Sequence, residues 1–101
     1  MPVRDTLRRQ GVIGEETLRD ELKSELTAPK ASGEPEIVIE RPNPATTHLF
    51  VIWSKWSDLE QMVRSRIILD AYTEARGQDE AIRVTVAMGL TPTEANRLGV
   101  K

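Results

Sequence analysis

The chain has 101 residues, of which 39% are hydrophobic and 30% are charged, and its formal net charge is −2. That length and composition are typical of one globular domain with a modest core, and not of a disordered chain. The absence of cysteine excludes disulfides, thiolate nucleophiles and Cys-ligated metal sites.

The charge balance is unlike that of a strongly basic nucleic-acid binder. No stretch approaches the roughly 18 consecutive apolar residues of a membrane span. Because no apolar run follows the N-terminal arginines, we expect no signal peptide, no membrane association and a cytoplasmic location.

The N-terminal region predicts two helices, Arg4–Gln10 and Glu15–Leu26, separated by Gly11 and Gly14. Leucine recurs every fourth residue in the second helix and forms one apolar stripe. We expect residues 1–28 to form a helical segment. Residues 29–35 are rich in Pro, Gly and Ser and are expected to link it to an α+β core over residues 36–101.

Two strands are predicted next, over Glu36–Arg41 and Thr46–Ser54. The prolines of the Pro42–Pro44 segment enforce a turn between them, so the strands are expected to form an antiparallel hairpin. The second strand is apolar on both faces over Leu49–Trp53, which is typical of a central strand.

A long helix follows, because Ser57 and Glu60 match a capping box and apolar residues then recur at helical spacing as far as Ala75. Gly77 stands where a left-handed C-cap belongs. The paired acidic residues Glu15–Glu16 and Asp79–Glu80 are expected to be solvated charges.

The segment Ala81–Met88 alternates apolar and polar residues, which predicts a third strand with one buried face. The residues expected on that face are Ile82, Val84, Val86 and Met88. A second capping box at Thr91–Glu94, with a proline at the first helical position, predicts a short helix over Pro92–Leu98 that stops at Gly99.

These elements predict the α+β class, in the order α-α-β-β-α-β-α within a single domain. A strand, a long helix and a strand in succession predict a parallel pair, because such crossovers place their strands side by side. With the antiparallel hairpin, the result is a three-stranded mixed sheet with helices packed on one face.

A His-led strand over His48–Ser54, a helix segment that begins Arg64-Ser65-Arg66, and the step Leu90–Glu94 follow one another in the second half of the chain. In this order and pattern, residues 48–98 resemble the BolA family, small proteins with a KH-like α+β fold. The resemblance implies a protein partner of the monothiol glutaredoxin type and an iron–sulfur cluster held by histidines.

The ligand positions that the resemblance implies are only partly matched. His48 lies near the first, but the second falls on Arg83, which stays protonated and cannot ligate a metal. Ser65 replaces a histidine in the helix motif. We therefore expect neither a metal nor a cofactor, and His48 is the one residue considered as a ligand.

No nucleophile elbow, P-loop, dinucleotide fingerprint or zinc motif is present. A Gly-x-x-Gly sequence of the KH type occurs only at Gly11–Gly14, beside Arg8 and Arg9 and ahead of the strands, where a turn between helices is expected. We therefore expect a non-enzymatic interaction or regulatory module.

Phe50 and Ile52 are expected on the open face of the sheet, beside Thr85 and Ala87. This face and the Pro42–Thr47 loop would bind a protein partner, unless the N-terminal helices cover the face.

The alternative function is weak nucleic-acid binding through Arg64, Arg66 and Arg83, although the first two lie about 200° apart on a helix. Trp53 and Trp56 are expected to be core anchors or, alternatively, partner hot spots. The oligomeric state and the identity of a partner stay open.

Overall fold

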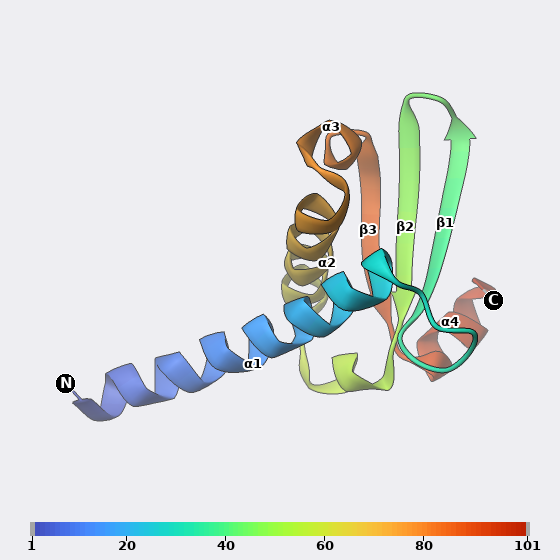
Figure 1. The fold of residues 1–101 in the computed structure, drawn as a ribbon. Helices are drawn as coiled ribbons and strands as arrows, with labels where there is room; N and C mark the ends of the chain where they lie inside the picture. Colours follow the sequence, from blue (N-terminus) through green and yellow to red (C-terminus); the bar gives the residue numbers. More distant parts are fainter. Residues whose placement is uncertain (1, 101) are drawn as a thin grey trace.

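The computed structural model describes the backbone of residues 2–100 and the side chains of residues 14–100. Figure 1 shows the elements in chain order, and the α+β class is confirmed. They are α1 (Pro2–Thr27), β1 (Glu36–Asn43), β2 (Thr46–Ile52), the 3-10 helix η1 (Ser54–Asp58), α2 (Gln61–Arg76), α3 (Gln78–Ala81), β3 (Val84–Leu90) and α4 (Pro92–Leu98).

The three strands form one mixed sheet in the order β1-β2-β3. β1 pairs antiparallel with β2, and β3 pairs parallel with β2, as predicted. The central position of β2 explains its apolar side chains on both faces, because a central strand has neighbours on each side and cover above and below.

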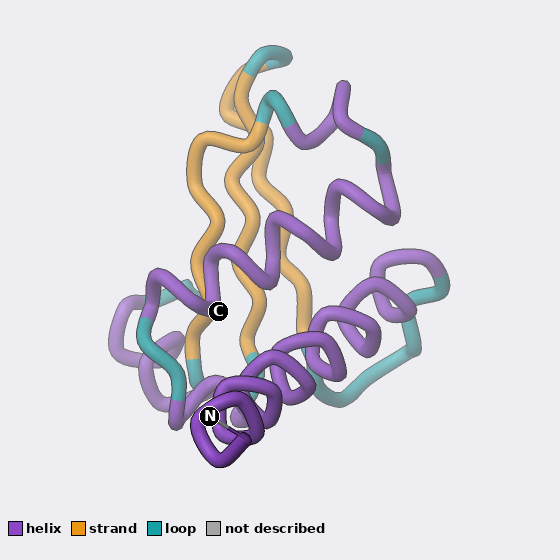
Figure 2. Tube along the Cα trace, turned by 90° about the vertical axis from the view of Figure 1, so that its left-hand side faces the viewer, coloured by secondary structure: helices purple, strands orange, loops and turns teal. Residues whose placement is uncertain are grey.

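The main core lies between the sheet and the helices α1 and α2, on the face that we call the inner face. Leu49 and Val51 of β2 project there and pack with Ile68 and Tyr72 of α2, all of them fully or almost fully buried. Figure 2 shows the helices crossing in front of the strands. Burial of such side chains is the main favourable term in folding.

The N-terminal region is one helix, so the prediction of two helices divided by Gly11 and Gly14 is wrong. A glycine inside a helix costs up to about 1 kcal/mol, which weakens a helix without breaking it. The side chains of Arg8 and Arg9 lie outside the described residues. Figure 1 shows the N-terminal half of α1 extending away from the sheet.

In the hairpin, the first strand is longer than predicted and the second strand is shorter. β1 continues through Pro42 to Asn43, so the turn falls at Pro44 and Ala45, and β2 ends at Ile52. Pro42 fits into β1 because this is an edge strand, where a missing N–H leaves no ladder hydrogen bond unmade.

The predicted capping box of Ser57 and Glu60 is wrong. Residues 54–58 form η1, and α2 begins at Gln61 with Glu60 as an N-cap that makes no side-chain hydrogen bond. The reason is tertiary: Trp56 must reach the core, where its indole nitrogen donates to the Val51 carbonyl at 2.9 Å. A tight 3-10 turn directs it there.

The start of the third strand was also predicted too early. Gly77 has a positive φ of 90° but a ψ of 163°, so it does not form the left-handed C-cap that was predicted. It leads into the short helix α3, and β3 begins only at Val84. Ile82 therefore lies before the strand and is 82% exposed.

A register shift near the start of β3 breaks the predicted alternation. Thr47 pairs with Val84, but the next residue, His48, pairs with Val86. The extra residue, Thr85, is a bulge that changes which face the following side chains occupy. Val84 and Ala87 consequently pack into the main core, whereas Met88 packs on the opposite face.

The capping box at the last helix is confirmed. The Thr91 hydroxyl accepts the Glu94 N–H, and the Glu94 carboxylate accepts the Thr91 N–H. α4 lies at the end of the sheet where β2 and β3 finish and β1 begins (Figure 1). Within the described residues, none of the helices combines the length and apolar character that a membrane span requires.

Candidate interaction surface

Three rows of side chains cross the outer face of the sheet, which is the face turned away from α1 and α2. Strand pairing sets Val38, Phe50 and Met88 side by side in the middle row. The row nearest the β1–β2 turn contains Glu40, His48 and Val86, and the row nearest α4 contains Glu36, Ile52 and Leu90.

Only the last of these rows is covered. Ala95 of α4 packs onto Ile52 and Leu90, and each of the three is at most 4% exposed. The prediction that Ile52 lies open is therefore wrong. Phe50 was placed correctly, since it is half-buried and packs against the edge of this cluster.

A hollow of about 300 Å³ continues the middle row toward α4. Met88 and Leu98 both line it, and Leu98 is 60% exposed. We call the apolar side chains Val38, Phe50, Met88 and Leu98 the outer patch. The alternative that N-terminal helices cover this face is wrong, because the leucines of α1 pack into the main core on the inner face.

The two β3 residues expected beside Phe50 do not lie there. Thr85 is exposed at the bulge, and Ala87 packs into the main core. The neighbour of Phe50 in β3 is Met88. Val38 and Met88 were missed because membership of the row depends on register, and the sequence signal for Val38 was only its central place in the run Ile37–Ile39.

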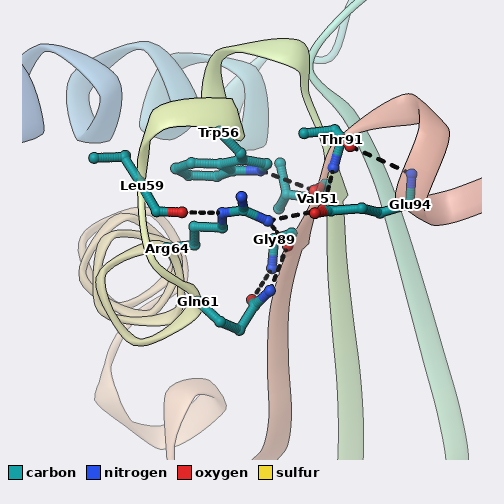
Figure 3. A network of polar contacts seen from close by, with 8 residues as sticks. All are labelled: Val51, Trp56, Leu59, Gln61, Arg64, Gly89, Thr91 and Glu94. Carbon is teal, nitrogen blue, oxygen red and sulfur yellow. Dashed lines mark hydrogen bonds and ion pairs between the residues drawn. The ribbon is translucent and has the colours of Figure 1, made fainter.

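Arg64 is buried rather than available to a partner, so its assignment to a nucleic-acid surface is wrong. Figure 3 shows its guanidinium enclosed between Trp56, the β3 backbone and α4. Nε donates to the Leu59 carbonyl at 2.8 Å, and one terminal nitrogen donates to the Gly89 carbonyl at 3.0 Å and to the Glu94 carboxylate at 2.8 Å. Arg64, in α2, thus bonds to the residue that follows η1, to β3 and to α4.

The Glu94 carboxylate closes this network at its solvent side. The hydrogen bond from the Thr91 N–H is the largest cause that lowers the pKa of Glu94, and the hydrogen bond from Arg64 is the next. Its side chain is 39% exposed, against 7% for Arg64, so solvent screens part of the interaction.

Acid is expected to destabilise the protein through Glu94. Its pKa is lowered from 4.5 in the native state, so the unfolded state binds more protons and stability rises with pH in this range. The stabilisation by the Glu94 carboxylate is fully present above the usual carboxyl pKa. It is lost as the pH falls through the lowered native-state pKa of Glu94. Urea unfolding of the wild type and Glu94→Gln at a series of pH values measures it.

The Glu94→Gln variant is expected to show a shallower loss of stability below about pH 4.5, because an amide does not titrate there. Glu60→Gln is the matched control, since the Glu60 side chain makes no cap hydrogen bond. Parallel stability curves for the wild type and Glu94→Gln would contradict the prediction.

The other two predicted arginines do not join Arg64. Arg66 is exposed and donates to the Glu15 carboxylate of α1 at 2.8 Å, a contact that raises the pKa of Arg66. Arg83 is exposed just ahead of β3, where its carbonyl accepts the Thr47 N–H. The three arginines do not form one basic surface.

His48 lies beside Glu40 in the row nearest the β1–β2 turn, and its Nδ1 is 3.9 Å from a Glu40 carboxylate oxygen. Among the residues that the structure describes, no three His, Cys, Asp or Glu side chains gather as a metal site would need. These donors do not fit a histidine-held iron–sulfur cluster, since one imidazole and one carboxylate leave the coordination incomplete.

The tryptophans are core anchors. Trp53 is 2% exposed and Trp56 is fully buried, and their rings meet edge to face with centroids 5.2 Å apart. A buried aromatic pair of this kind stabilises the fold and is not accessible to a partner. The hot-spot alternative is therefore wrong for both residues.

Comparison with known proteins adds no relative: no family model, no curated protein and no solved structure matches this chain.

Proposed function

We propose that this chain is a non-enzymatic protein-interaction module that binds a partner protein through the outer patch. The observation that carries the proposal is the middle row, where three apolar side chains from three strands lie together on a face that α4 covers only at one end. A contiguous, incompletely covered apolar surface is typical of an interaction site.

The polar groups of the chain support a binding role. The most enclosed ones, in the Arg64 network, bond to backbone carbonyls and to each other and so act as structural connections. Around the outer patch, Glu40 and His48 lie on one side and Arg97 borders the hollow. This arrangement of an apolar centre with a polar rim is that of many protein interfaces.

The proposal includes a regulatory role like that of BolA-family proteins. It is supported by the order of the helices and strands, and it does not include a metal cluster. The alternative, nucleic-acid binding, has less support, because Arg64 is buried and Arg66 is paired with Glu15.

The test is affinity capture from cell extract with the wild type, Phe50→Lys and the control Thr85→Lys. Thr85 is exposed at the bulge, so its variant adds the same charge outside the outer patch. We expect a protein captured by the wild type and the control to be reduced at least about tenfold with Phe50→Lys, since burying an unpaired charge costs more than 1.4 kcal/mol.

The captured protein should stay bound when salt is raised from about 50 to about 200 mM, whereas nucleic-acid binding should weaken steeply. Circular dichroism and thermal unfolding establish that each variant is folded. Capture that is nuclease-sensitive, or that is equal for all three proteins, would overturn the proposal.

A further inference from the structure

The two edges of the sheet differ in how their backbone groups are satisfied. At β3, the Gln61 side-chain amide donates to the Gly89 carbonyl at 2.9 Å and accepts the Gly89 N–H at 2.8 Å. The Ser65 hydroxyl donates to the Ala87 carbonyl at 2.6 Å. Side chains of α2 therefore occupy the edge that another strand would use, as Figure 3 shows for Gln61.

The edge of β1 has no such protection. β1 has β2 as its one neighbour in the sheet. Within the described part of the chain, no hydrogen bond outside the β1–β2 ladder reaches the backbone of Ile37–Arg41. Alternate residues of an edge strand present N–H and C=O groups away from the sheet, and an extended segment pairs with them by strand addition.

A cavity lies directly beside this edge on the inner face. It has a volume of about 450 Å³ and lies between β1 and the segment that follows α1. Ile37, Ile39, Leu26, Pro29 and Pro35 form an apolar part of its lining, and Glu25, Lys30, Glu36 and Arg76 also line it. An added strand places every second side chain on the inner face, where the part of the cavity beside Ile37 and Ile39 accepts apolar side chains.

The segment over the cavity is held in place by polar contacts. The Glu34 carboxylate accepts the backbone N–H and the hydroxyl of Ser54 at 2.9 and 2.7 Å, and these bonds lower the pKa of Glu34. The Lys30 N–H donates to the Glu25 carboxylate at 3.1 Å. A cavity with a fixed wall requires little ordering when a ligand enters.

On the outer face, the charge beside the edge is negative. Glu40 is exposed, and one of its carboxylate oxygens lies 3.9 Å from Nδ1 of His48. Opposite charges on neighbouring strands attract and like charges repel, so the outward side chains of an added strand are best basic.

From these observations we infer that the edge of β1 over Ile37–Arg41 binds an extended peptide segment in which apolar and basic residues alternate. The apolar side chains enter the cavity over Ile37 and Ile39, and the basic side chains lie beside Glu40. This site shares Val38 with the outer patch, but its backbone edge and its cavity do not involve Phe50, Met88 or Leu98.

A second copy of the chain fits the edge less well. Antiparallel pairing of two β1 strands about Val38 sets Glu36 of one copy opposite Glu40 of the other, which is repulsive. Pairing about Ile39 instead sets Glu40 opposite Val38 and Arg41 opposite Ile37. Each of these charged side chains then faces an apolar residue of the other copy and has no opposite charge across from it.

The probe is a capped hexapeptide of alternating lysine and valine, titrated into the full ¹⁵N-labelled protein. We expect shifts in the amide signals of Ile37–Arg41 and slower hydrogen exchange of their outward N–H groups. Two control peptides are matched in length: one has glutamate in place of lysine, and the other has every backbone amide N-methylated. Both are expected to bind at least about fivefold more weakly.

A charge reversal in the protein completes the test. Glu40→Lys is expected to reduce affinity for the lysine peptide about fivefold and to improve binding of the glutamate peptide. Glu16→Lys, an exposed site on α1, gives the same change in net charge and is expected to leave both affinities unchanged.

Any of four results would overturn the inference: no shift at about 1 mM peptide, equal binding of the N-methylated peptide, shifts confined to Phe50, Met88 and Leu98, or a peptide-free dimer joined at β1. Phe50→Lys is expected to leave peptide binding unchanged, so failure here and failure of the proposed function are distinguishable.

Discussion

Replacing Gly89 with alanine is expected to lower the free energy of unfolding by about 3 kcal/mol, the upper end of the usual cost of overpacking. An added Cβ would lie 2.8 Å from the Cβ of Arg64 and 2.9 Å from the Trp56 ring. Neither can move away easily, since Trp56 is fully buried and Arg64 makes three hydrogen bonds.

This expectation runs against intrinsic propensity, because alanine is usually better than glycine within a strand. Gly14→Ala is the matched control: nothing lies within 4 Å of the added Cβ in α1, and the variant is expected to gain up to about 1 kcal/mol. Urea unfolding of both variants measures the difference. Equal stability of Gly89→Ala and the wild type would show that Trp56 and Arg64 do not pack against this backbone.

Replacing Arg64 with methionine is expected to cost about 3 kcal/mol, measured in the same way. Methionine keeps the length of the stem but leaves the Leu59 carbonyl without its donor and removes the link to Glu94. Hydrogen bonds to a charged group contribute about 1.5–3 kcal/mol each, and an unpaired buried carbonyl carries its own desolvation penalty.

The size of this effect is limited by two features. Gln61 still donates to the Gly89 carbonyl in the variant, and Glu94 is exposed enough to be hydrated. Arg66→Met is the control, because its pair with Glu15 is exposed and screened by solvent, so its loss is expected to change stability little. Similar losses for the two variants would mean that Arg64 acts as a surface residue.

The local patterns of the sequence determined the class, the mixed sheet and the last helix. The apolar run of β2 marks a central strand wherever its neighbours lie, and the Thr91–Glu94 capping box needs only residues within one turn. Such signals act between near neighbours in the chain, so a single sequence contains them.

Only the tertiary structure decided the register of β3, the burial of Arg64 and the composition of the outer patch. The bulge at Thr85 moves Met88 beside Phe50, and no local pattern records such a shift. Arg64 has the sequence appearance of a surface residue, but carbonyls from Leu59 and Gly89 meet around it when η1 and β3 come together. The face and the partners of a side chain depend on segments distant in sequence, and long-range packing overrides local preference at these positions.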